Sequence, residues 1–131
     1  MEHKNVVEGS NRYFLRKVTI YERAFRNIHL YCKAHNLDSP FGYVYVISNP
    51  AWNELKIGSS IDAESRLLQY NTYSPRRDYR LEYYILIPDY LSVEQQLHKD
   101  FNAVNEWVNL PLVELKSELK RIKQKIYWAI V

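Results

Sequence analysis

The stretch from Gly42 to Arg66 constrains the fold of this chain more than any other. Its first part, VYVI, is β-branched and aromatic, and a turn signal follows at Asn49 and Pro50. The run LKIG then resumes an extended pattern, and the residues from Ser59 to Asp62 are suited to cap a helix that carries Arg66. This order predicts a strand at 43–48, a strand at 54–58 and a helix at 62–71.

The next segment predicts a loop, a third strand and a second helix. Residues 72–78, TYSPRRD, have the composition of a loop, and residues 80–88, RLEYYILIP, alternate and then become apolar, as in a partly buried strand. A helix is expected from Ser92 to Phe101, because Ser92 and Gln95 have the spacing of a capping box.

Both ends of the chain carry the pattern of an amphipathic helix. One apolar stripe lies within residues 11–36 and the other follows a helix start near residues 109–111; their members are Phe14, Val18, Tyr21, Phe25, Ile28 and Cys32, then Leu112, Leu115, Leu119, Ile122, Ile126 and Ala129. The two stripes either pack on each other or form a dimer contact. The polar faces of both helices are basic, which fits either a solvated surface or a contact with DNA.

Length and composition indicate one domain of a globular protein. The 131 residues are 47% hydrophobic and 25% charged, which is ordinary for such a domain. No apolar run approaches the roughly 20 residues that cross a bilayer, and the N-terminus lacks the apolar stretch of a signal peptide. We therefore expect a cytoplasmic protein with no membrane association. The net charge of +3 resides in the two ends, while the middle is mildly acidic, so a nucleic-acid partner would also contact the ends.

Four side chains in the middle of the chain have the chemistry needed for phosphodiester hydrolysis. A tyrosine such as Tyr45 can act as a base if a nearby cation such as Lys56 lowers its pKa. Arg66 offers a planar fork for a phosphate, and Glu94 offers the hard oxygen ligand that Mg²⁺ accepts. Each of these residues alone is more often structural or solvated.

The order and spacing of these residues resemble the GIY-YIG nuclease superfamily. VYVISN is similar to its first motif, with Tyr45 at the motif tyrosine, and KIG at Lys56, Ile57 and Gly58 is similar to its second, with lysine in place of tyrosine. Arg66 and Glu94 fall at the positions of the family's arginine and glutamate. The succession of KIG, arginine, glutamate, histidine and an EW pair is similar to a phage and bacterial branch of that superfamily.

This resemblance covers residues 42–110 and implies an α/β fold of the α+β type. Its core would be a small three-stranded antiparallel sheet flanked by helices, with a basic helical extension at 1–41 and a basic C-terminal helix at 111–131. The implied activity is a DNA endonuclease that depends on Mg²⁺ or Mn²⁺. Cleavage of both strands would need a homodimer or two binding events.

The resemblance also implies a role for each site residue. Tyr45 would be the general base or would orient water, and Lys56 would support its deprotonation. Arg66 would bind the scissile phosphate, Glu94 the metal ion, and His98 would be an auxiliary donor beside both. The residues expected to contact DNA are Tyr43, at a position where the family usually has glycine, and Arg76 and Arg77 in the predicted loop.

A second interpretation is a module that keeps this fold without cutting. It would bind DNA or another protein, and the mildly acidic middle of the chain favours it. The complete set of hydrolytic side chains favours the enzyme.

Overall fold

The computed structural model describes residues 11–130, apart from the side chains of Asn11 and Phe14. The first ten residues of the predicted N-terminal extension lie outside this part. The elements, in chain order, are α1 (Asn11–Ala34), β1 (Phe41–Ser48), β2 (Leu55–Ser60), α2 (Ala63–Thr72), β3 (Arg80–Pro88), α3 (Tyr90–Asp100), β4 (Trp107–Val108) and α4 (Leu112–Ile130). The fold is of the α+β class, as predicted from the sequence.

The strands form one antiparallel sheet in the order β3-β1-β2-β4. The sequence predicted three strands, and the structure adds β4, which pairs through Leu55 with Val108 and through Lys56 with Trp107. Two residues are too few to carry the alternation by which a strand is recognised. In the central pairing Tyr45 lies opposite Gly58 on β2 and opposite Tyr84 on β3.

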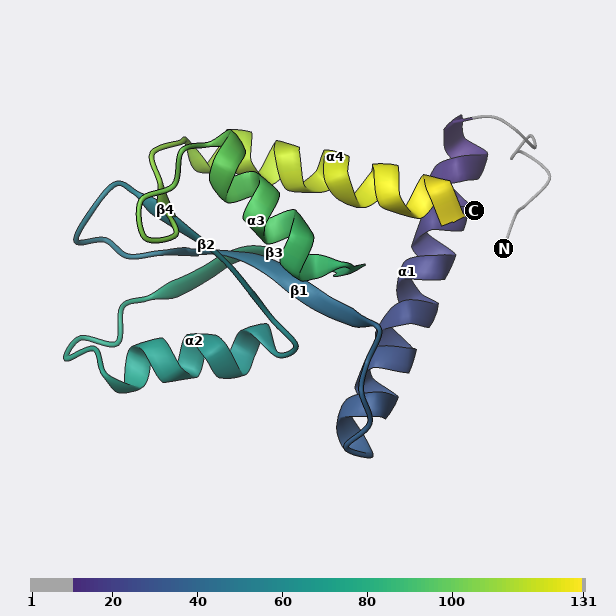
Figure 1. The fold of residues 1–131 in the computed structure, drawn as a ribbon, viewed down its shortest axis with the longest axis horizontal. Coiled ribbons are helices and arrows are strands. Elements are labelled where there is room, and N and C mark those ends of the chain that lie inside the picture. The colour runs from purple at the N-terminus through teal and green to yellow at the C-terminus, as the bar shows by residue number, and fades with distance from the viewer. Residues whose placement is uncertain (1–10, 131) are drawn as a thin grey trace.

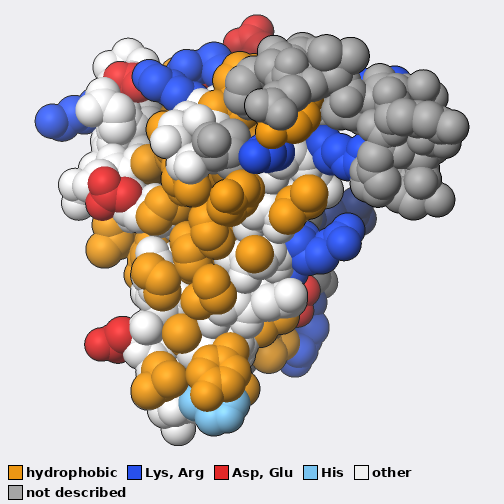
Figure 2. Space-filling view, turned by 90° about the vertical axis from the view of Figure 1, so that its right-hand side faces the viewer, with side chains coloured by type: hydrophobic (Ala, Val, Ile, Leu, Met, Phe, Trp, Pro, Cys, Tyr) orange, Lys and Arg blue, Asp and Glu red, His pale blue; other side chains and the backbone are white. Residues whose placement is uncertain are grey.

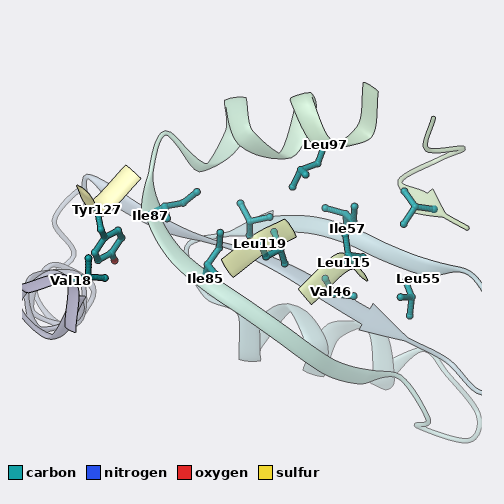
Figure 3. Packing of buried hydrophobic residues seen from close by; sticks show 12 residues of the cluster. Val18, Val46, Leu55, Ile57, Ile85, Ile87, Leu97, Leu115, Leu119 and Tyr127 are labelled. Atoms are coloured by element: carbon teal, nitrogen blue, oxygen red, sulfur yellow. The ribbon is translucent and has the colours of Figure 1, made fainter. Parts of the chain in front are cut away.

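Helices cover both faces of the sheet (Figure 1). α2 lies on one face, where it packs on Tyr45 and Ile47 of β1. α3 and α4 lie on the other face, where the main core gathers. Because successive side chains of a strand point to opposite faces, Val44 and Val46 of β1 belong to this main core. Figure 3 shows Leu97 of α3 and Leu115 and Leu119 of α4 packed toward it.

α1 stands across the end of the sheet and contacts α4 (Figure 1). The Phe25 and Tyr127 rings meet edge to face at 5.5 Å, and Lys123 forms an ion pair with Glu22 at 3.0 Å. The two end helices therefore pack on each other, which was one of the two arrangements expected. The Tyr127 hydroxyl donates to the Leu86 carbonyl at 2.6 Å and joins α4 to β3.

The buried face of α1 differs from the predicted stripe at one position. Val18 and Cys32 are buried as predicted, but Ile28 is 45% exposed and its neighbour His29 is buried. The side chain of Phe14 lies outside the described residues. His29 tolerates burial because Nε2 donates to the Ile61 carbonyl at 2.7 Å, which leaves Nδ1 to accept from Ser39 at 2.7 Å. These polar contacts rotate the buried face away from Ile28.

Two further details of the helices differ from the sequence prediction. α3 begins at Tyr90, preceded by Asp89 in a left-handed conformation without a side-chain cap, so the predicted capping box at Ser92 is wrong. The chain turns directly out of β3 there, which leaves Ser92 inside the first turn. In α4 the last buried residue is Tyr127 and not Ala129, because the tyrosine reaches the Leu86 carbonyl.

One outer face of the molecule is rich in apolar side chains. Figure 2 shows a band of hydrophobic side chains with lysine and arginine side chains beside it. Several exposed residues of α1 are apolar, among them Ile20, Ile28 and Tyr31. Among residues 11–130, no helix has the length and apolar character needed to cross a membrane.

Candidate active site

Tyr45 and Gly58 form the centre of the candidate site. They are opposite each other on β1 and β2, and the Tyr45 ring crosses the sheet over the glycine. A Cβ atom at Gly58 would stand 2.5 Å from the Tyr45 hydroxyl oxygen and 2.6 Å from Cζ. Only glycine leaves room for the ring at this point. The phenol therefore lies over β2, and the side chain is only 1% exposed.

Arg66 and Glu94 both act on the Tyr45 phenol. Burial raises the pKa of Tyr45 far above its usual value of 10.0, and a hydrogen bond to Tyr70 raises it further. The Arg66 guanidinium lowers this pKa and the Glu94 carboxylate raises it. Arg66 of α2 and Glu94 of α3 thus each lie within electrostatic reach of Tyr45 on β1. The raised pKa favours the second of the two roles expected for Tyr45, the orientation of water, over that of a general base.

Glu94 approaches the site from the opposite face of the sheet. Ser59, the residue after Gly58, donates to Glu94 Oε1 at 2.6 Å. Because alternate residues of β2 point to opposite faces, Gly58 faces the phenol while Ser59 faces the carboxylate. β2 therefore contacts the phenol through one face and the Glu94 carboxylate of α3 through the other. The Glu94 side chain remains 14% exposed.

His98 lies beside Glu94 on α3, as its spacing of four residues requires. Its Nε2 donates to the Ile57 carbonyl at 2.8 Å and is 3.7 Å from Glu94 Oε2. Since a carbonyl only accepts, Nε2 carries the proton, and Nδ1 is an acceptor in the neutral ring. The hydrogen bond to β2 fixes the imidazole next to the carboxylate.

Lys56 lies on the same strand as Gly58 but faces a different set of groups. Its ammonium is 3.3 Å from Glu106 Oε1 and lies over the rings of Tyr70 at 5.3 Å and Trp107 at 5.8 Å. The cation with the strongest effect on Tyr45 is Arg66. Lys56 contacts the Tyr70 ring, and Tyr70 is in turn hydrogen-bonded to Tyr45.

Tyr70 and Ser59 are site residues that sequence reasoning missed. Tyr70 lies one helical turn after Arg66, accepts the Tyr45 hydrogen bond and stacks under the Lys56 ammonium. A signal for Tyr70 was present in the sequence, because residues four apart share a face of a helix. Ser59 has no such signal, since its role depends on the position of α3 against β2.

The three residues expected to contact DNA lie in different places. Tyr43 is half-buried beside the rings of His29 at 5.3 Å and Tyr84 at 5.4 Å, in a hollow next to the start of α2. Arg76 lines an open pocket that also contains Arg66. Arg77 is exposed in the same loop, with a left-handed backbone at φ 51°. Only Arg76 therefore shares a hollow with a predicted catalytic residue.

The donor set at Glu94 fits a hard divalent ion that keeps most of its water. Among residues 11–130, no three His, Cys, Asp or Glu side chains group together as a metal cage. Mg²⁺ does not need such a cage, because one or two carboxylates together with water and substrate phosphate oxygens satisfy it. The partly exposed carboxylate of Glu94, oriented by Ser59, meets this requirement.

Comparison with known protein families matches residues 42–123 to the T5orf172 domain. The matched segment is more than half of the chain. The chain belongs to the T5orf172 domain family. The T5orf172 segment contains Tyr45, Arg66 and Glu94 and ends within α4, while α1 lies before it. Comparisons with curated proteins and with solved structures found no match.

The T5orf172 match corrects the family expected from the motifs. The assignment to the GIY-YIG nuclease superfamily is wrong, because the family that matches is a distinct one. Motifs as short as VYVISN and KIG describe a strand, a turn and a second strand, and this local structure is not specific to one family. The geometry of the T5orf172 site does not depend on this assignment, because it is given by the contacts described above.

Proposed function

We propose that this T5orf172 protein is a divalent-metal-dependent DNA endonuclease. The observation that supports the proposal is the position of Tyr45 over Gly58, with Arg66 and Glu94 each within electrostatic reach of its phenol. A phenol, a guanidinium and a carboxylate around β2 supply the groups that can orient water, bind a phosphate and hold a metal ion.

Each side chain has a defined part in this reaction. Arg66 is exposed on α2 and presents its planar fork to the scissile phosphate, where it stabilises the charge of the transition state. The hydroxyl groups of Tyr45 and Tyr70, joined by a hydrogen bond, orient the attacking water. Ser59 and His98 hold the Glu94 carboxylate in place. Mg²⁺ or Mn²⁺ on Glu94 would neutralise charge on the phosphate and stabilise the leaving oxygen.

The proposal also includes the partner of the protein, its oligomeric state and its location. DNA is the proposed partner, since basic residues of α1 and α4 can contact phosphates outside the site. One such centre cuts one strand, so we include a homodimer for cleavage of both strands. We further propose that the protein acts in the cytoplasm.

Nicking of supercoiled plasmid tests the proposal. The wild-type protein is incubated with plasmid in Mg²⁺, beside Glu94→Gln, which keeps the size and the bond to Ser59 but removes the charge. Glu114→Gln, at an exposed position in the first turn of α4, is the matched control. We expect metal-dependent nicking by the wild type and the control and a loss of at least about a hundredfold in Glu94→Gln. Equal nicking by all three, or no cleavage by the wild type of either the plasmid or a single-stranded oligonucleotide, would reject the enzyme.

The non-cleaving module makes the opposite prediction in the same samples. It would retard DNA in a gel in a salt-sensitive manner while giving no product in Mg²⁺. Retention of binding by an inactive wild type would therefore identify the module.

A further inference from the structure

An open aromatic pocket adjoins the candidate active site. It lies between the β1–β2 turn and the loop from α2 to β3 and has a volume of about 630 Å³. Four aromatic side chains line it together with Arg66 and Arg76: Trp52, Tyr70, Tyr73 and Tyr79. Volumes of this size are typical of small-ligand sites. Arg66 and Tyr70 belong to both the pocket and the candidate active site, so a ligand in the pocket would be next to the phosphate held by Arg66.

The aromatic walls of the pocket present ring surfaces to solvent. Tyr79 packs against Trp52 at 6.2 Å and against Tyr70 at 5.6 Å, which fixes these three rings. Tyr73, at the end of α2, is 88% exposed, and Trp52 is also exposed. Exposed rings of this kind are the surfaces on which nucleobases stack, whatever their sequence.

A fixed carboxylate adds a hydrogen-bond acceptor to this pocket. Asp78 Oδ1 accepts from Asn49 Nδ2 at 3.2 Å and from the Ser74 hydroxyl at 3.3 Å. Asn49 is itself buried and held by the Ala51 amide at 2.9 Å, so the carboxylate has a defined position. Ionised carboxylates accept several hydrogen bonds, and the edges of nucleobases carry N–H donors. Stacking surfaces and an edge acceptor thus occur in one pocket, with arginines at its border.

We propose that this pocket binds one unpaired nucleobase beside the phosphate held by Arg66. The substrate would then be a single strand or a strand with unpaired nucleotides, because the faces of paired bases are covered by their neighbours in a duplex. This inference rests on the proposed nuclease function for the adjoining phosphate. It adds the class of substrate, which the hydrolytic side chains alone do not define.

Binding without metal separates this inference from cleavage. Fluorescence anisotropy in EDTA compares three labelled ligands: a mixed-sequence single strand of about twelve nucleotides, an abasic strand of the same length, and the matching duplex. We expect the single strand to bind roughly tenfold more tightly than the abasic strand, because only the former can stack. Equal affinity for the two strands, or preference for the duplex, would overturn the inference.

Variants at Tyr73 locate the effect in the pocket. Tyr73→Ala should lose roughly tenfold in affinity for the intact strand and leave the abasic strand unchanged, and Tyr73→Phe should keep the wild-type values. Because Tyr73 is exposed, its replacement should not unfold the protein, and a loss of affinity would not be due to loss of the fold. Tyr31→Ala on α1 is the control for removal of an exposed ring. Equal weakening of both strands by Tyr73→Ala would contradict the stacking.

The two proposals fail in different ways. Plasmid nicking together with equal affinity for the intact and abasic strands would support the nuclease function and reject the nucleobase pocket. Discrimination against the abasic strand without metal-dependent products would leave the base pocket and reject the nuclease.

Discussion

The Tyr45 ring lies over Gly58 so closely that a Cβ atom on the glycine would stand 2.5 Å from the phenol oxygen. The two residues are opposite each other in the β1–β2 pairing, so the contact is set by the register of the sheet. The absence of a side chain at Gly58 thereby provides the space in which the phenol lies.

Gly58→Ala should disturb the site and the fold together. The added methyl group forces the Tyr45 ring away, and overpacking of this kind costs about 1–3 kcal/mol in the free energy of unfolding. Urea titration of the single variants and of the double variant with Tyr45→Ala measures the coupling. Removal of the ring removes the three closest contacts of the methyl group, so the cost of Gly58→Ala should fall by most of its value. Additive costs would show that the ring does not fill this space.

The Tyr45 phenol should stay protonated throughout the neutral range. Burial and the bond to Tyr70 raise its pKa, and the opposing effect of Arg66 does not cancel this. Cleavage rates of the wild type and of Tyr45→Phe, measured from about pH 6 to pH 9, should therefore differ by a constant factor of roughly ten. A rising limb in the wild type that Tyr45→Phe lacks would identify Tyr45 as a base instead.

The ion pair between Lys33 and Asp62 should stabilise the protein until the pH falls well into the acid range. Burial on its own raises the pKa of Asp62, but hydrogen bonds from Lys33 and Ser65 outweigh it and lower this pKa from 3.8 to about 2. A lowered folded-state pKa gives stability that is present above about pH 4 and is lost as the pH falls toward 2.

Asp62→Asn tests this pair, since asparagine still caps α2 but carries no charge. We expect a loss of about 1 kcal/mol at neutral pH, after allowance for solvent screening, and a flatter acid limb in urea titrations. Asp38→Asn, at an exposed position, is the control. A parallel acid limb in Asp62→Asn and the wild type would be inconsistent with the pair.

Tyr127 should contribute to the attachment of α4 to the sheet. Its buried hydroxyl donates to the Leu86 carbonyl at 2.6 Å, so Tyr127→Phe leaves that carbonyl without this donor and should cost about 1–2 kcal/mol. Burial also raises the pKa of Tyr127. Tyr127 in the folded state then keeps its proton at pH values above 10.0, the pKa in the unfolded state. The free energy of unfolding therefore falls as the pH rises above 10.0. In urea titrations this alkaline decline should be shallower in Tyr127→Phe, and an unchanged slope would contradict the assignment.

The sequence predicted the elements around Tyr45 well because their signals are local. The strand around Tyr45, the helix that carries Arg66 and the strand at 80–88 follow from alternation, turn residues and capping, and they lie where expected. β4 was missed because its two residues depend on pairing with Leu55 and Lys56. His29 is buried in place of Ile28 because it forms hydrogen bonds with Ser39 and Ile61. Both partners lie outside α1, so the spacing of apolar residues in the helix does not reveal them.

The candidate site was only partly accessible from sequence, for the same reason. The chemistry of side chains such as Arg66 and Glu94 follows from their residue type, so it could be predicted from the sequence. The contact of Ser59 with Glu94 joins residues 35 positions apart, and it exists only because α3 packs over β2. The aromatic pocket likewise needs two loops that the sheet brings together.

The measurement that tests the central claim most directly is the place where a metal ion binds. In an NMR titration with Mn²⁺, the ion broadens the signals of the backbone amides nearest to it. We predict that the amides of Gly58, Ser59 and Glu94 broaden first, and that Glu94→Gln abolishes this selectivity. Broadening centred elsewhere on the molecule, or the same pattern in Glu94→Gln, would contradict a hydrolytic centre at the edge of β2.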